Sequence, residues 1–262
     1  MKILKITKTG LFYKVKFDDD TVYKFHESII IDYKFIKKNI DVAPSKLQKA
    51  LKDNEYYLAL DKGVRYLSTV KSKSEVVLYL KRHFEEDVIG KTIDKLIELK
   101  LIDDKECAKV YADIMKKKGY GIKKISNELK ELQIDDEYIK EALGNYTLHD
   151  GLENCRKAFN KYFSSVKKGS KLGAKTKIAN HLISKGFTNE EITIVINENQ
   201  NLFDEKIDED KALIDTYNKL LKTKKQNCDD KKFKNKVIRS LSQKGFPIYK
   251  ILKVIESGYE DD

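Results

Sequence analysis

The sequence predicts a mainly α-helical protein of tandem three-helix repeats stacked in a curved array, with a small N-terminal β-rich domain. One observation is a repeated sequence motif, HLISKGF at 181–187 and SLSQKGF at 240–246. Recurrence of a motif along a chain indicates a duplicated structural unit. Another is the strand-like alternation of apolar and polar residues in the first 26 residues. The third is a content of only 2 Pro and 12 Gly in 262 residues, which favours long helices.

The N-terminal segment predicts three strands. Residues 3–10, 11–17 and 21–26 alternate apolar and polar side chains at period two. The three aspartates at 18–20 separate the last two strands. They are interpreted as a solvated hairpin turn, because no further ligands that could complete a metal site are placed around them.

Residues 27–42 are expected to form a short helical connector. Its buried residues are expected to be Ile29, Ile30, Ile31 and Phe35. Pro44 then stands where a helix begins, since proline is favoured in the first helical turn. The N-terminal domain with its connector helix is predicted to span residues 1–57.

From about residue 45 onward every segment has the apolar spacing of a helix. A leucine followed by a large apolar residue recurs as Leu80 and Phe84, Leu129 and Ile134, Leu182 and Phe187, and Leu241 and Phe246. The predicted repeats are 58–102, 103–146, 148–202 and 208–259. A unit of this length buries too little apolar surface alone, so stacked neighbours must share a core.

Each repeat divides into three helices. The second helices are predicted at 74–83, 122–132, 174–185 and 233–244, and the third helices at 86–100, 136–144, 189–198 and 248–257. The spacing of a capping box supports three of the helix starts, at Ser72 and Glu75, Asp103 and Glu106, and Thr188 and Glu191.

The charge balance indicates a polyanionic partner or an acidic protein surface. The chain carries 53 basic and 42 acidic residues, a net charge of +11. Only four of the basic residues are Arg. Lysine contacts phosphate as a hydrated point charge, so nucleic-acid contact should follow the backbone more than the base sequence. An A/T-rich genome would account for the lysine content equally well.

The basic residues gather between the first and second helices of each repeat, and they are the candidate filament- or nucleic-acid-binding residues. They are Lys71 and Lys73, with Lys81 and Arg82 at the end of the second helix; Lys116, Lys117, Lys118, Lys123 and Lys124; Lys167, Lys168, Lys171, Lys175 and Lys177; and Lys222, Lys224, Lys225, Lys231 and Lys232. Aligned along one edge, these clusters would form a basic rail that suits a polyanion.

The turns between the second and third helices have the opposite sign. They are acidic at 85–87, 135–137 and 189–191, whereas the fourth repeat departs from the pattern. The helix macrodipole accounts for these acidic turns, because each opens a helix. The macrodipole accounts less well for the lysines near helix N-termini, where positive charge is unfavourable. The basic rail is the hypothesis that explains these lysines.

No constellation of catalytic residues is found, so we expect a binding protein without a cofactor or metal. Residues 169–176 nearly match a phosphate-binding loop but carry Ala174 where glycine is required. The four His are dispersed, and the three Cys fit neither a disulfide framework nor a metal site. Cys107 is expected to be a small core residue. Tyr120 could stack on a base, but packing is the more common role.

The segment at the N-terminus has no apolar signal region, and no run of residues reaches membrane length. Together with the cysteine content, this pattern predicts a reduced, cytoplasmic, monomeric protein with no membrane partner.

Three runs, at 74–80, 101–111 and 116–129, resemble the RecX family of recombination regulators. The matching residues are Ser74, Glu75, Leu101, Ile102, Asp103, Asp104, Ala108, Gly119, Ile125, Glu128 and Leu129. The strand-rich start and the extra repeat resemble the longer members from Gram-positive bacteria. Family members often carry Arg where this chain has Lys71 and the lysines at 116–118, so the charge is kept but the bidentate fork is absent.

The resemblance implies a function in homologous recombination, DNA repair and the SOS response. RecX proteins bind RecA and its filament on single-stranded DNA, lodge along the helical groove, and restrain RecA's ATPase and strand exchange. Some members also bind DNA. The alternative is a sequence-nonspecific nucleic-acid-binding helical repeat protein that has no specific protein partner.

Overall fold

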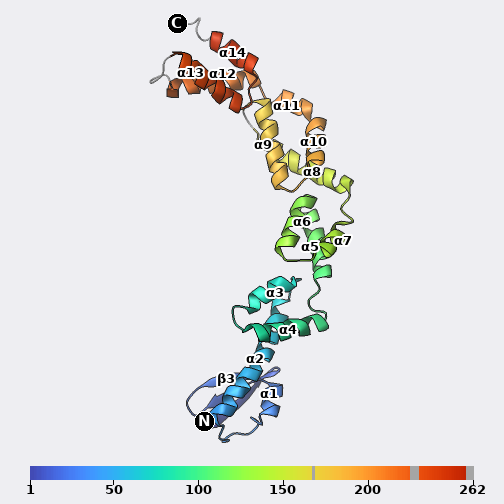
Figure 1. The fold of residues 1–262 in the computed structure, drawn as a ribbon, viewed down its shortest axis with the longest axis vertical. Coiled ribbons are helices and arrows are strands. Elements are labelled where there is room, and N and C mark those ends of the chain that lie inside the picture. Colours follow the sequence, from blue (N-terminus) through green and yellow to red (C-terminus); the bar gives the residue numbers. More distant parts are fainter. Residues whose placement is uncertain (167–168, 225–229, 258–262) are drawn as a thin grey trace. The chain divides into compact units, whose positions relative to one another are not determined.

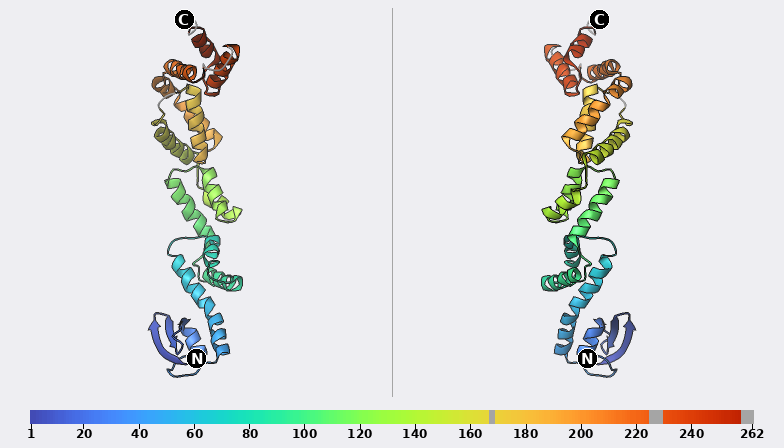
Figure 2. Two further views of the ribbon diagram at one scale, coloured as in Figure 1. Left: turned by 90° about the vertical axis from the view of Figure 1, so that its left-hand side faces the viewer. Right: turned by 90° about the vertical axis from the view of Figure 1, so that its right-hand side faces the viewer.

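A computed structural model describes residues 1–166, 169–224 and 230–257. The described residues form three strands followed by fourteen helices (Figures 1 and 2), which confirms the mainly α fold with a small N-terminal sheet. The chain divides into two compact units. Unit 1 contains Met1–Val110 and Leu129–Ile139, and unit 2 contains Tyr111–Glu128 and Lys140–Asp262.

The N-terminal sheet has the strand order β1-β2-β3 and is antiparallel throughout, as the alternation predicts. Its strands are β1 (Ile3–Thr9), β2 (Phe12–Phe17) and β3 (Val22–His26). The aspartates at 18–20 form the turn, where Asp18 accepts a hydrogen bond from the Lys2 amide at 2.9 Å. Val15, Phe17 and Phe25 are fully buried in the core of the sheet.

Two helices complete this core, α1 (Glu27–Asp32) and α2 (Pro44–Tyr66). In α1 the residues Ile29 and Ile30 are buried, but the expected burial of Ile31 is wrong, because its side chain is 62% exposed. Successive helical residues point about 100° apart, so three consecutive isoleucines cannot all face one core.

The helix α2 is held along the outer edge of β3 by the buried side chain of Asn54. Its amide oxygen accepts from the His26 amide at 2.8 Å, and its amide nitrogen donates to the Lys24 carbonyl at 2.8 Å. These bonds satisfy strand groups that an edge strand otherwise leaves open. Since α2 continues unbroken to Tyr66, the boundary predicted at residue 57 falls inside a helix.

The remaining helices carry the repeats. They are α3 (Lys73–Leu80), α4 (Glu86–Glu98), α5 (Asp104–Lys117), α6 (Ile122–Glu131), α7 (Asp136–Leu143), α8 (Leu148–Phe163), α9 (Lys171–Ser184), α10 (Asn189–Glu198), α11 (Gln200–Lys206), α12 (Glu209–Lys224), α13 (Asp230–Gln243) and α14 (Ile248–Ser257). The short helix α11 was not predicted. The four recurrent leucines at 80, 129, 182 and 241 are completely buried.

Apolar clusters lie within successive sets of three helices. Val76, Leu80 and Ile93 belong to a cluster of α3 and α4, which pack with α2. A second cluster joins α8, α9 and α10, and a third joins α12, α13 and α14. The finer division into an N-terminal domain and four repeats remains a prediction.

Capping boxes open several of these helices. The boxes predicted at Ser72 and Thr188 are present, each with the reciprocal bond from the glutamate three residues later. Thr147 and Asp150 form another at the start of α8. The sequence motif does not predict this capping box, because the motif has Glu or Gln at the last position and this box has Asp.

The second helices meet end to end at joints between consecutive repeats. At the start of α6, the Gly121 amide donates to the Lys185 carbonyl at 2.9 Å and the Lys123 amide donates to the Gly186 carbonyl at 3.0 Å. Lys185 is the C-cap of α9. Amides at one helix N-terminus therefore meet carbonyls at another helix C-terminus, which satisfies groups that both helices leave unpaired.

Equivalent joints involve α9 and α3. At the start of α9, the Ser170 hydroxyl donates to the Lys244 carbonyl at 2.5 Å, just after α13. At the start of α3, the Ser74 hydroxyl donates to the Leu132 carbonyl at 2.5 Å, just after α6. Each joint lies within one compact unit.

We predict that Gly121→Ala destabilises the protein, because an added Cβ would lie 2.3 Å from the Gly186 carbonyl oxygen. Overpacking of this kind costs about 1–3 kcal/mol in the free energy of unfolding. Gly90→Ala in α4 is the control, since its Cβ would meet nothing within 4 Å. It should stabilise the helix by about 0.5–1 kcal/mol. Urea titrations followed by circular dichroism measure both, and equal midpoints for the two variants would contradict the close joint.

A second prediction concerns pH. The Asp150 carboxylate lies 2.8 Å from the Lys116 ammonium, and this hydrogen bond, with those from Thr147, lowers the pKa of Asp150 from 3.8 to about 2. Its stabilisation is therefore present above pH 3.8 and lost as the pH falls through about 2. Asp150→Asn should reduce the loss of stability over this window in urea titrations. Lys116→Gln should reduce this acid-induced loss of stability by a similar amount. The double variant should show no greater reduction than either single variant.

Candidate interaction surface

The predicted basic residues divide into those that pair with carboxylates of this chain and those that do not. The ion pairs join Lys71 to Glu75 (3.2 Å), Lys81 to Glu86 (3.9 Å), Lys116 to Asp150 (2.8 Å), Lys124 to Glu128 (3.2 Å) and Lys171 to Asp204 (2.6 Å). Lys175 instead donates to Gln200 at 2.7 Å. Such surface pairs contribute only about 0–1 kcal/mol each, so a polyanion can compete for these lysines.

The other members are exposed and form no ion pair with any carboxylate of the described residues. They are Lys73, Arg82, Lys117, Lys118, Lys123, Lys177, Lys222, Lys231 and Lys232. Lys167, Lys168 and Lys225 lie outside the described residues, as does the side chain of Lys224. The basic rail as a whole therefore remains a prediction.

The turn from α5 to α6 gathers four lysines in unit 2. We call Lys117, Lys118, Lys123 and Lys124 the α5–α6 basic cluster. Lys117 ends α5 and Lys118 follows it, and Lys123 lies in the first turn of α6, where its amide donates to the Gly186 carbonyl. The joint thus holds the backbone of Lys123, whose side chain is exposed.

Tyr120 lies at the centre of this cluster. The ammonium groups of Lys124 and Lys185 lie 5.3 Å and 4.8 Å from its ring centroid, so the ring holds two cations by its π-electrons. This geometry supports the packing role over base stacking. Lys185 was not among the predicted residues, although its place in the repeated phrase, just before a glycine that Lys244 also precedes, could have indicated it.

Lys124 is also bound by the carboxylate of Glu128, which accepts a hydrogen bond from the Tyr111 hydroxyl. The Tyr111 bond chiefly, and Lys124 next, lower the pKa of Glu128. Glu128 therefore stays ionised and holds Lys124 along α6. Lys117, Lys118 and Lys123 are the members of the cluster left for an external ligand.

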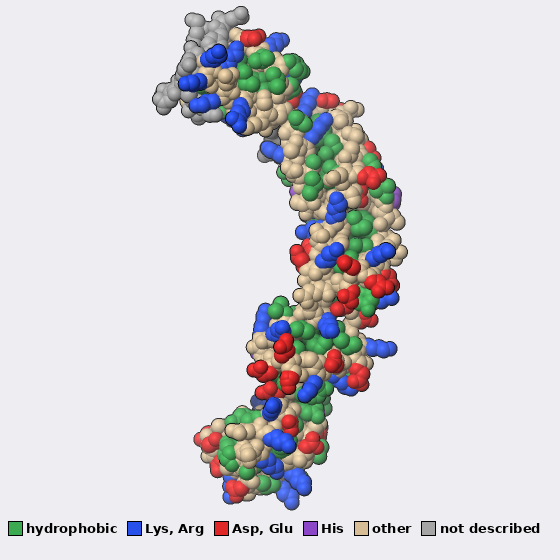
Figure 3. Space-filling model, viewed as in Figure 1, with side chains coloured by type: hydrophobic (Ala, Val, Ile, Leu, Met, Phe, Trp, Pro, Cys, Tyr) green, Lys and Arg blue, Asp and Glu red, His purple; other side chains and the backbone are tan. Residues whose placement is uncertain are grey.

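Both signs of charge are present on the surface of each unit. On the face shown in Figure 3, Lys and Arg side chains lie among Asp and Glu side chains. A mixed surface of this kind suits a partner that presents both signs, such as a protein, as well as a polyanion.

The structure gives no described group of side chains a catalytic arrangement. Cys107 and Cys155 are buried, and burial raises the pKa of their thiols to about 11 and about 12, so they are poor nucleophiles. Among the described residues, no three His, Cys, Asp or Glu side chains gather as metal ligands. No described helix is both long enough and apolar enough to cross a membrane.

The segment that nearly matches a phosphate-binding loop serves as a helix cap. Ser170 is the N-cap of α9 and accepts from the Gly173 amide at 2.9 Å, while its hydroxyl donates to the Lys244 carbonyl. A Cβ at Gly173 would lie 2.7 Å from that carbonyl oxygen. The end of α13 thus occupies the place that a phosphate would take in a nucleotide-binding loop.

Comparison with known proteins bears on the whole chain. The family model described as RecX, second three-helix domain, matches residues 103–143. The Regulatory protein RecX of Enterococcus faecalis is 28% identical over 251 residues, covering 93% of this chain and 92% of that protein. The Regulatory protein RecX of Staphylococcus aureus strain JH9 is 28% identical over 253 residues, covering 95% of this chain and 89% of that protein.

A solved structure agrees in fold. The crystal structure of a regulatory protein RecX matches with a TM-score of 0.56 and 22% identity, over 75% of this chain and 98% of that one. The resemblance found in the sequence is thereby confirmed. This chain is similar to the RecX regulatory proteins over nearly its whole length.

Proposed function

We propose that this chain is a non-enzymatic regulator of homologous recombination and DNA repair that binds RecA and RecA–single-stranded DNA filaments. On binding, it inhibits RecA's ATPase and strand exchange. The observation that carries the proposal is the relationship to RecX regulatory proteins across more than nine-tenths of the chain. A role confined to one repeat would leave most of that similarity without a reason.

The α5–α6 basic cluster supports the nucleic-acid side of this function. Lys117, Lys118 and Lys123 are exposed and carry no ion pair within the described chain, and the amide of Lys123 is bonded at the joint. Lysines contact phosphates without reading bases. Such a surface suits a regulator that must act on filaments assembled on any DNA sequence.

A second candidate is a sequence-nonspecific nucleic-acid-binding protein without a specific protein partner. The net charge of +11 and the unpaired lysines favour it. The two candidates differ in salt dependence, because binding to phosphates alone weakens steeply with salt, whereas a protein interface with apolar contacts weakens less.

The deciding experiment is a titration of RecA's ATPase on single-stranded DNA with this protein at fixed physiological salt. We expect loss of ATPase at protein concentrations well below those that coat the DNA, because the target is the filament. Binding of the protein to the same DNA without RecA is measured in parallel. Loss of ATPase only where the DNA is coated would support the second candidate, and no loss at all would refute the regulatory proposal.

A second prediction tests the cluster. The triple variant Lys117→Gln, Lys118→Gln and Lys123→Gln should bind single-stranded DNA more weakly. It should also lower the slope of log K against log salt by about 2, since each phosphate contact on a single strand contributes about 0.7. The matched control replaces the exposed lysines 140, 161 and 211 by Gln, with the same change in net charge. Equal slopes for the two triple variants would exclude the cluster as a phosphate contact.

A further inference from the structure

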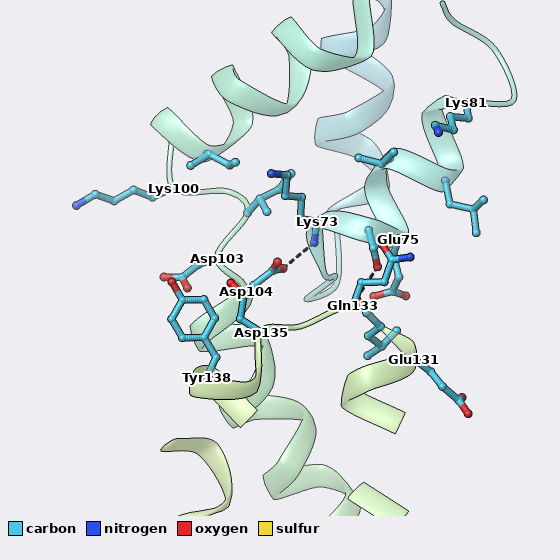
Figure 4. A pocket seen from close by; sticks show the side chains of 16 residues that line it. Lys73, Glu75, Lys81, Lys100, Asp103, Asp104, Glu131, Gln133, Asp135 and Tyr138 are labelled. Atoms are coloured by element: carbon cyan, nitrogen blue, oxygen red, sulfur yellow. Dashed lines mark hydrogen bonds between the residues drawn. The ribbon is translucent and has the colours of Figure 1, made fainter. Parts of the chain in front are cut away.

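A cavity of about 990 Å³ opens in unit 1 between α3, the end of α4, and the turns before α5 and α7. Figure 4 shows its lining. Five carboxylate residues and three lysines line it, together with apolar residues that include Leu78 and Ile97. In a chain with a net charge of +11, this concave surface carries the opposite sign. We call it the acidic groove.

Three of the five carboxylates gather on one side of the acidic groove, away from Glu75 and Glu131. Asp103, Asp104 and Asp135 lie together there beside Tyr138 (Figure 4). Asp103 and Asp104 already bind backbone amides, Asp103 that of Glu106 at 3.0 Å and Asp104 that of Lys73 at 2.7 Å. Burial chiefly, and then the charges of Asp135 and Asp103, raise the pKa of Asp104. The hydrogen bond from the Lys73 amide lowers this pKa, but by less. A cation placed among these groups would offset their mutual repulsion.

The apolar part of the acidic groove includes two side chains that are well exposed. The Leu78 side chain is 63% exposed and that of Ile97 is 41% exposed. Leu78 stands two residues before the buried Leu80, and the equivalent positions before the other recurrent leucines are Asn127, Asn180 and Arg239. The fold of a repeat thus tolerates a polar residue here, so the repeat architecture gives no reason for an exposed leucine.

The combination of charge and apolar surface selects the class of ligand. Phosphates of a nucleic acid would be repelled by the three aspartates. A protein segment with an apolar side chain beside Lys or Arg meets both features, with the apolar side chain on Leu78 and Ile97 and the cations among the carboxylates.

We propose that the acidic groove binds a cationic, apolar-anchored segment of the protein partner. The assignment rests on the proposed function in one respect, namely that RecA is the partner that supplies the segment. The chain then recognises the two components of a nucleoprotein filament by separate surfaces. The α5–α6 basic cluster contacts the phosphates and the acidic groove contacts the protein.

The test measures binding of the full chain to purified RecA without DNA, and separately to single-stranded DNA without RecA. One groove variant is Leu78→Asn, which introduces the residue found at the equivalent position in two other repeats. The other is Asp103→Asn with Asp135→Asn, which removes two charges but keeps residues that favour helix N-caps. The control for Leu78→Asn is Ile183→Asn, which changes a side chain that is 52% exposed and lies outside the groove. The control for the double aspartate variant is Glu137→Gln with Glu190→Gln, which also removes two negative charges.

Each groove variant should bind RecA at least about tenfold more weakly, as for residues at the centre of an interface. The controls should bind like the wild type, and all variants should keep the wild-type circular dichroism spectrum. Binding of single-stranded DNA should not weaken in the groove variants.

Two results would overturn the acidic groove while leaving the proposed function intact. One is wild-type affinity of the groove variants for RecA, and the other is an equal loss of DNA affinity, which would make the groove a nucleic-acid site. Absence of RecA binding by the wild type, with and without DNA, would overturn the proposed function and this assignment together.

Discussion

The close approach of helix ends at the joints is the constraint on which the rest of the helical structure depends. A three-helix unit leaves unpaired amides at the start of its second helix and unpaired carbonyls at the end. At the joint of α6 with α9, the amides of Gly121 and Lys123 donate hydrogen bonds to the carbonyls of Lys185 and Gly186, respectively. The approach is possible only because neither glycine has a Cβ, and Gly186 also adopts a φ of +87°.

The same joints explain where the lysines lie. Positive charge near the N-terminus of an isolated helix is unfavourable. Here the N-terminus of α6 faces the carbonyl end of α9, and the N-terminus of α9 faces the Lys244 carbonyl. Carboxylates such as Asp150 and Asp204 neutralise several of the neighbouring lysines. Of the lysines that remain unpaired in the α5–α6 basic cluster, Lys123 has its backbone amide bonded at this joint.

The charge of the chain thus supports two kinds of recognition in different compact units. The α5–α6 basic cluster in unit 2 offers ammonium groups of the kind that bind phosphate without reading sequence. The acidic groove in unit 1 offers carboxylates beside the exposed Leu78 and Ile97. A partner of one sign would use only one of these surfaces, whereas a filament of protein on DNA presents ligands for both.

The sequence by itself determined the fold class, the strands, most helix starts and the buried leucines, because these depend on local periodicity and capping. It also carried the family resemblance, through the ordered motifs between residues 74 and 129. It failed at the burial of Ile31 and at the short helix α11. In those places the direction of a side chain, or the absence of a helix-breaking residue, mattered more than composition.

Only the tertiary structure decided which basic residues are paired and which are free. Lys116 and Lys117 are adjacent in the sequence, yet Lys116 binds Asp150 and Lys117 points to solvent. The acidic groove also could not be predicted from the sequence. In the sequence, Asp103 and Asp135 indicate two separate helix starts, and Leu78 is one of many apolar residues. Ion pairs and cavities form between residues distant in the chain, so their partners are set by packing and not by local spacing.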